Sequence, residues 1–183
     1  LFFLADEAVE NSTRGDVEVN HGEYEYDRLV ATVGDSGFNV ISERRKHDTD
    51  PSLYADSVAQ QIRRLLAGGV PANDIAVLGD SKGALIAMLV STRLENREIR
   101  YAILGGCSAA NLAAFPLTFH GHVLSIHEYG DTLGHSCAAV FRRSRDMGNR
   151  KEIMLETGLG HSVFAHPLMA WLAPSVAWAR AGR

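Results

Sequence analysis

The sequence lacks the features that define three common classes of protein. No apolar run approaches the ~20 residues needed to span a bilayer. No predicted strand is followed by G-x-G-x-x-G or G-x-x-x-x-G-K-[ST], which argues against a nucleotide-binding domain. The densest groups of basic residues, at 44–46 and 142–143, are interpreted as solvated loop ends, and the net charge is −4. We therefore expect neither a membrane span nor a nucleic-acid partner.

Cysteine is scarce: the 183 residues include two, Cys107 and Cys137. His135 lies two residues before Cys137, but the chain offers no convincing set of zinc ligands, and we expect neither a metal nor an organic cofactor. The cysteines follow two predicted strands that should be neighbours, so they either form a disulfide or remain small buried thiols. A disulfide would favour an extracytoplasmic location; without one, a cytoplasmic location is favoured.

The residues that are present predict an α/β fold. The chain is 46% hydrophobic and 22% charged, and its length suits one domain spanning 1–183. Apolar helical spacing at 24–36, a capping Asp50 before Pro51, and apolar segments after Gly83 and at 175–179 indicate helices. Six apolar runs between them read as strands, at 1–5, 38–43, 75–78, 101–104, 123–126 and 152–155. This alternation predicts a doubly wound, mostly parallel six-stranded sheet with helices on both faces, in the order 2-1-3-4-5-6.

The most informative stretch is Gly79-Asp80-Ser81-Lys82-Gly83, between the third strand and a helix that is apolar on nearly every face. G-x-S-x-G at a strand-to-helix junction is typical of a nucleophile elbow, a sharp turn that exposes a serine. Glycine two residues to either side lets the neighbouring chain pass close to that turn. Ser81 is therefore the candidate nucleophile, whereas Asp80 and Lys82 are expected to make a local ion pair or solvent contacts.

Two further candidates follow later strands. Asp131 comes after the fifth strand and His161 after the sixth, so that serine, acid and histidine all lie beyond carboxyl ends of strands, where α/β proteins place their sites. In a triad, His161 would accept the proton of Ser81 and Asp131 would orient the imidazole. The alternatives left open are Glu128 as the acid and, as the histidine, His166, His135 or His127.

The motifs GDSKGA, LGGCS, GDTLGHSC and TGLGHSVF, in this order, resemble the α/β-hydrolase superfamily, specifically its small, lid-less bacterial members. The resemblance covers most of the chain from Tyr24 onward. It implies a compact hydrolase with a Ser81–Asp131–His161 triad. It does not identify a substrate.

The sequence departs from the superfamily after the first strand, where many members have His-Gly and this chain has Ala5-Asp6-Glu7. The oxyanion hole should consist of the backbone N–H groups of Lys82 and Glu7. Two carboxylates beside a developing oxyanion would oppose it unless they point away, and losing one donor costs about 10²–10³ in rate. We interpret the polar stretch 6–23 as a loop over the catalytic face.

The sequence thus predicts a serine hydrolase that cleaves a carboxylic ester, or a thioester or amide, through an acyl-serine intermediate. Because the chain is short, we expect a shallow, open pocket that takes small acyl groups or an exposed polymer ester. The alternative is a catalytically weak or inactive protein that keeps the fold and binds a ligand; the Asp6-Glu7 segment is its main support.

Overall fold

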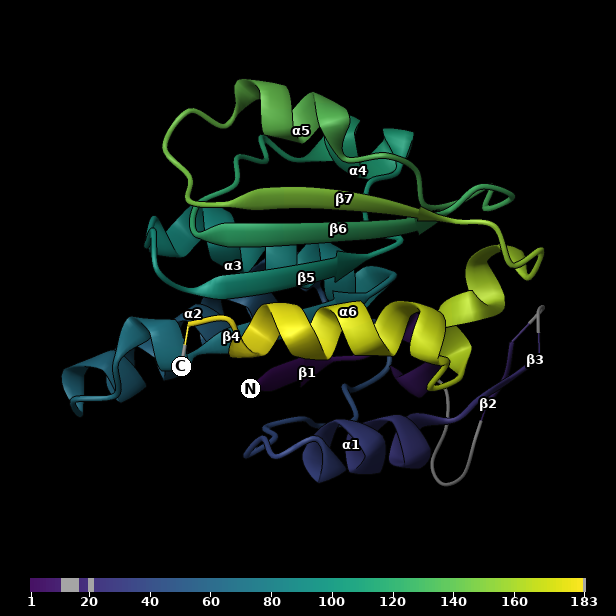
Figure 1. Cartoon of the computed structure of the whole chain (residues 1–183), viewed down its shortest axis with the longest axis horizontal. Helices are drawn as coiled ribbons and strands as arrows, with labels where there is room; N and C mark the ends of the chain where they lie inside the picture. The colour runs from purple at the N-terminus through teal and green to yellow at the C-terminus, as the bar shows by residue number, and fades with distance from the viewer. Residues whose placement is uncertain (11–16, 20–21, 183) are drawn as a thin grey trace.

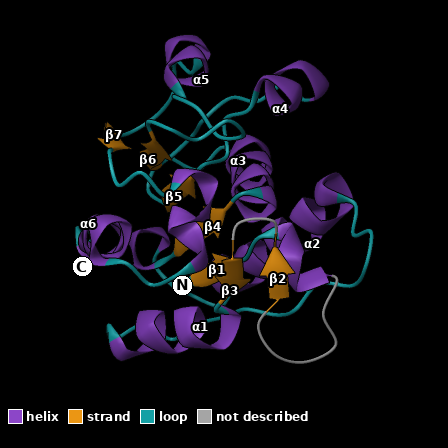
Figure 2. Cartoon of the chain, turned by 90° about the vertical axis from the view of Figure 1, so that its right-hand side faces the viewer, coloured by secondary structure: helices purple, strands orange, loops and turns teal. Residues whose placement is uncertain are grey.

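The computed structural model describes residues 1–10, 17–19 and 22–182. Its centre is a five-stranded parallel sheet in the order β1-β4-β5-β6-β7 (Figure 1). The strands are β1 (Phe2–Leu4), β4 (Ala76–Asp80), β5 (Arg100–Leu104), β6 (His122–Glu128) and β7 (Arg150–Leu155). The α/β class, the parallel sheet and the helices on both faces are confirmed. Figure 2 views the edge of this sheet at which the functional candidates lie.

The predicted second strand, 38–43, is not a full strand. It pairs with β1 through one bridge, Phe2 to Ile41, in which Phe3 N–H donates to Ile41 O (3.0 Å) and Ile41 N–H to Leu1 O (2.8 Å). The strand pairing stops at the next residue, because the Ser42 hydroxyl donates a hydrogen bond to the Phe3 carbonyl (2.8 Å). The sheet has five strands for this reason, although the segment does lie beside β1, at the predicted edge.

Helices cover both faces of the sheet. Helices α2 (Pro51–Ala67) and α3 (Lys82–Leu94) pack on one face, and α1 (Tyr26–Asp35) and α6 (Met169–Arg180) pack on the other (Figure 2). Asp50 caps α2 as predicted, accepting from the N–H groups of Ser52 (2.8 Å) and Leu53 (2.9 Å). Two short helices, α4 (Ala109–Ala114) and α5 (Ala138–Arg143), were not predicted.

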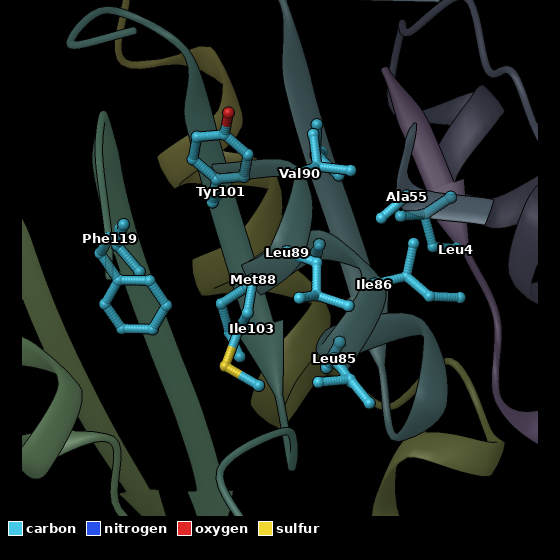
Figure 3. Close-up of a cluster of buried hydrophobic side chains, with 14 of the residues drawn as sticks. Leu4, Ala55, Leu85, Ile86, Met88, Leu89, Val90, Tyr101, Ile103 and Phe119 are labelled. Carbon is cyan, nitrogen blue, oxygen red and sulfur yellow. The ribbon is translucent and has the colours of Figure 1, made fainter. Parts of the chain in front are cut away.

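Helix α3 is the centre of one hydrophobic cluster. Nine consecutive residues, Gly83 to Ser91, are buried, as expected of a helix that is apolar on every face. Leu85, Ile86 and Met88 share this cluster with Leu4 of β1 and Ile103 of β5 (Figure 3). This burial fixes the first turn of α3, and therefore the serine before it, against the sheet.

The described parts of the stretch 6–23 contain regular structure that the expected loop did not include. Glu7–Glu10 forms a 3-10 turn (η1), and β2 (Val17–Val19) pairs antiparallel with β3 (Gly22–Tyr24). The rest of the predicted loop, 11–16 and 20–21, lies outside the described residues. Two further 3-10 turns complete the elements, η2 (Ala72–Asp74) and η3 (Gly160–Ala165). Within the described part of the chain, no helix has the length and apolarity to cross a membrane.

Candidate active site

Ser81 occupies a strained turn between β4 and α3. Its φ of 53° and ψ of −118° lie outside the regions that L-residues prefer, a cost of order 1–3 kcal/mol that concentrates at functional sites. A Cβ at Gly79 would collide with the Gly83 carbonyl, and a Cβ at Gly83 would collide with the carbonyl of Leu4. Ser81 N–H donates to Leu104 O (2.9 Å), which ties the turn to β5. Both glycines of the motif are therefore required by backbone contacts.

The structure brings Asp131 and His161 together. His161 Nδ1 lies 2.7 Å from Asp131 Oδ2, and the Asp131 side chain is fully buried. Leu133 N–H donates to the other carboxylate oxygen (2.8 Å). Burial alone would raise the pKa of Asp131, but the hydrogen bonds from His161 and the backbone outweigh it and lower the pKa. Asp131 is thus held as the carboxylate that orients the imidazole.

Ser81 and His161 line one cavity of about 610 Å³ at the carboxyl ends of the strands. Within the described residues no hydrogen bond joins them, and His161 Nε2 has no hydrogen-bond partner. Its nearest charged group is Asp6, with Oδ2 at 3.9 Å. The nitrogen that a triad would use is therefore available for a serine or a ligand, as catalytic hydrogen bonds often tighten only when substrate binds.

The rival residues have other roles. Glu128, the alternative acid, accepts from the N–H groups of Thr157 (2.9 Å) and Gly158 (3.1 Å) and so holds the loop that carries His161. His166 Nδ1 lies 3.4 Å from Glu25 Oε2. His135 is exposed and lines the cavity. Among the described residues, no hydrogen bond or ion pair joins Asp131 to His166, His135 or the third alternative, His127. Sequence reasoning placed Glu128 beside the site but did not foresee that it supports the loop.

The backbone N–H groups of Glu7 and Lys82 are the predicted oxyanion donors. Neither donates a hydrogen bond to any described residue. The Glu7 carboxylate pairs with Lys82 Nζ (3.2 Å). A cation therefore compensates this carboxylate, and one of the two electrostatic objections to the Ala5-Asp6-Glu7 sequence is removed.

A buried ionic network holds η1 in place. Glu10 Oε1 pairs with Arg45 Nε (2.8 Å), and Glu10 Oε2 pairs with Lys82 Nζ (2.7 Å). The side chains of Glu10 and Arg45 are each 1% exposed. Arg45 also donates to the Asp6 carbonyl (2.9 Å), and Thr49 N–H donates to Glu10 (3.3 Å). The interpretation of 44–46 as a solvated loop end is therefore wrong for Arg45, which is buried. Neither Glu10 nor Arg45 was predicted to have this role, because their partners lie in distant segments of the chain.

Asp80 has no cationic partner among the described residues. Both of its oxygens accept from the Tyr24 hydroxyl (3.1 and 3.0 Å). Burial, and next the charge of Asp6, raise the pKa of Asp80 well above its usual value, against the opposing hydrogen bond from Tyr24. The local ion pair expected of Asp80 and Lys82 does not form between them: Asp80 is buried, and Lys82 pairs with Glu7 and Glu10 instead.

Cys107 and Cys137 form a disulfide and are both buried. Beside it, His135 N–H donates to Cys107 O (2.9 Å). The bond therefore joins the loop after β5 to the loop after β6, which carries Asp131 further upstream. Within residues 1–10, 17–19 and 22–182, no group of His, Cys, Asp or Glu side chains could hold a metal ion.

Solved structures share this fold over nearly the whole described length of this chain. SOBER1 from Arabidopsis thaliana is 14% identical, with a TM-score of 0.59, and the match covers 99% of this chain and 98% of that one. A hydrolase assigned to the α/β superfamily from Xanthomonas campestris pv. campestris is 15% identical (TM-score 0.60, 97% and 95% covered). Esterase B from Lactobacillus rhamnosis, solved with a tributyrin phosphonate, is 12% identical (TM-score 0.60, 96% and 71% covered).

No family model matches the chain, and no curated protein is similar to it in sequence. The likeness is therefore one of architecture. The chain has the fold of the α/β hydrolases, as its motifs had indicated.

Proposed function

We propose that the protein is a serine hydrolase that cleaves a carboxylic ester, or a thioester or amide, with Ser81, His161 and Asp131 as its triad. One observation carries the proposal: Ser81 at a strained elbow shares a cavity with a histidine whose other ring nitrogen is hydrogen-bonded to a buried aspartate. The strained turn and the buried carboxylate both have a cost in stability, and a triad is the role that explains them together.

The reaction would proceed in two displacement steps. Ser81 Oγ forms a bond to the substrate carbonyl carbon while His161 Nε2 accepts its proton, and the carbonyl π electrons move to oxygen. Collapse of this tetrahedral species expels the leaving group, which takes the proton from Nε2, and leaves acyl-Ser81. Water then attacks in the same way, so that a carboxylic acid is released and Ser81 regains its proton. Asp131 stabilises the imidazolium in both steps.

Backbone N–H groups would stabilise the oxyanion in each tetrahedral species. Lys82 N–H lies at the first turn of α3, where the helix dipole favours negative charge, and Glu7 N–H would supply the second bond. The Lys82 side chain binds Glu7 and Glu10, and these bonds couple the α3 end of the proposed hole to the η1 end.

The cavity lining supports an uncharged acyl substrate. One part is apolar, formed by Leu85, Ala109, Ala110 and Leu133, and the polar part includes Ser108, Asn111 and Thr132. Lys82, the cation on the cavity wall, already has two carboxylate partners. We therefore expect small uncharged acyl groups or an exposed polymer ester, with no metal or organic cofactor.

A fluorophosphonate probe tests the proposal. Folded wild-type protein should label at Ser81, located by peptide mass spectrometry, and Ser81→Ala should not label. p-Nitrophenyl esters of increasing acyl length then test the pocket, and short chains should be turned over best. A folded wild type that neither labels nor hydrolyses any of these esters would contradict the proposal.

The second candidate is a binding protein without hydrolase activity. The contact between Asp6 and His161 Nε2 favours it, because an ion pair there could hold the imidazole away from the serine. In that case Ser81 would not label at any pH, although the cavity would still bind a ligand.

The disulfide supports an extracytoplasmic location, since such bonds persist in oxidising compartments. Cell fractionation, combined with thiol alkylation before and after reduction, tests this. Recovery in a reducing compartment with both thiols free would contradict it.

A further inference from the structure

Asp6 stands at the end of β1, where its side chain enters the site. Asp6 Oδ1 accepts from Ala8 N–H (2.6 Å), and this bond orients the carboxylate. Its other oxygen, Oδ2, then lies 3.9 Å from Nε2 of His161. The two side chains are only 18% and 12% exposed. Each oxygen of the Asp6 carboxylate thus has a defined neighbour, Ala8 N–H for Oδ1 and His161 Nε2 for Oδ2.

His161 consequently lies between two carboxylates. Asp131 binds Nδ1 on one side of the ring, and Asp6 faces Nε2 on the other. Asp80, at the end of β4, is the third acidic group that acts on the imidazole. The other ring neighbours, Gly105 and Phe164, carry no charge.

The remaining charged groups of the cavity are balanced among themselves. Glu7 pairs with Lys82, which also pairs with Glu10, and His135 lies on the cavity wall. The carboxylate of Asp6 has no such partner among the described residues, because Arg45 binds its backbone carbonyl rather than its side chain. Of the acidic residues Asp6, Glu7 and Glu10, Asp6 is therefore the one whose carboxylate acts on His161.

We propose that Asp6 is a positioning residue for the hydrolase described above: a second carboxylate that attracts the His161 imidazolium at Nε2 and sets the lowest pH at which Ser81 is activated. The inference rests on the proposed function. Nε2 accepts the serine proton only while the imidazole is neutral. A carboxylate beside Nε2 favours the protonated ring, so the neutral form is reached only at higher pH.

The electrostatics of the ring agree in sign with the contact geometry. Burial alone would lower the pKa of His161, but the hydrogen bond and charge of Asp131, followed by the charges of Asp6 and Asp80, outweigh it and raise the pKa. Removing the Asp6 charge should lower that pKa by about 1 unit. A pKa change of this size corresponds to the weak attraction expected between two charges about 4 Å apart in a cavity open to water.

The experiment compares Asp6→Asn with wild type and with Glu7→Gln, which removes a carboxylate from the next residue. The acidic limb of kcat/KM against pH should move down by about 1 unit in Asp6→Asn, and hydrolysis on that limb should become up to about tenfold faster. Glu7→Gln should leave the limb where it is, whatever its effect on the plateau. Asp6→Ser is a second variant, because its hydroxyl can still accept from Ala8 N–H while carrying no charge.

NMR titration of the His161 ring, assigned with His161→Gln, measures the pKa without requiring activity. A lowered pKa in Asp6→Asn or Asp6→Ser, with Glu7→Gln unchanged, supports the role of Asp6. If this shift appears in a protein that hydrolyses nothing, the proposed function fails while the effect of Asp6 on His161 stands. If the protein is active and neither Asp6 variant shifts the titration or the limb, the inference is overturned. Equal shifts in Asp6 and Glu7 variants also overturn it.

Discussion

Replacing Glu10 by glutamine tests how η1 is held over the site. The change keeps the shape of the side chain but removes its charge. In the native protein this carboxylate binds Arg45 Nε (2.8 Å), Lys82 Nζ (2.7 Å) and Thr49 N–H (3.3 Å). Glutamine can satisfy part of this geometry, yet Arg45, whose side chain is 1% exposed, would remain charged and buried without a counter-ion.

The expected cost follows from this burial. Removing one partner of a buried ion pair costs about 3–5 kcal/mol, because the remaining charge is uncompensated. Glu7→Gln is the matched control: it belongs to the same turn and pairs with the same lysine, but its side chain is 62% exposed. An exposed pair contributes about 0–1 kcal/mol. Glu10→Gln should therefore be the more destabilised variant by several kcal/mol.

Urea unfolding followed by fluorescence of the buried Trp171 measures both free energies. Activity provides a second measurement, because a loosened η1 would misplace Glu7 N–H, and loss of one oxyanion donor costs about 10²–10³ in kcat. Similar unfolding free energies for Glu10→Gln and Glu7→Gln would refute the reasoning. So would a double mutant with Arg45→Gln whose cost equals the sum of the single costs, because the two side chains would then be uncoupled.

Three other predictions concern the site and its supports. Gly83→Ala should cost about 3 kcal/mol or more, because its Cβ meets the Leu4 carbonyl, and the yield of folded protein measures this. Joint replacement of Cys107 and Cys137 by serine should lower stability by about 3–4 kcal/mol for a loop of this length, measured by urea unfolding without reductant; an unchanged midpoint would contradict it. Asp131→Asn should lower kcat by about 10³–10⁴. It should also move the acidic limb to lower pH, because it removes the carboxylate that favours the imidazolium.

Much of the elbow could be read from the sequence because its constraints are local. Gly79 lies four positions before Gly83 and would meet its carbonyl, a contact that the strand-to-helix turn itself creates. The contact of Gly83 with the Leu4 carbonyl of β1, by contrast, exists only in the folded sheet. The apolar character of the following residues likewise predicts burial without further information. Ser81, Asp131 and His161 follow β4, β6 and β7, and their position at one edge follows from the same parallel arrangement.

The differences from prediction arise where a side chain competes with the backbone or where a segment has no readable period. The segment 38–43 has the composition of a strand, but the Ser42 hydroxyl donates to the Phe3 carbonyl, which would otherwise accept a backbone hydrogen bond of the sheet. The hairpin of β2 and β3 forms in a stretch with little periodicity, so no pattern predicted it. Helices α4 and α5 are six residues each, too short to show an amphipathic period.

The roles of the charged residues at the site could not be predicted from the sequence. Asp6, Glu7 and Glu10 lie within five positions in the sequence and look alike there, as three acids after a strand. Their partners come from elsewhere: His161 for Asp6, Lys82 for Glu7, and Arg45 with Lys82 for Glu10. An acid beside an oxyanion hole can oppose catalysis, support the loop or tune the histidine, depending on its partner. Local sterics already specify the elbow in the amino-acid order, whereas the effect of each carboxylate depends on long-range distances that exist only once the chain has folded.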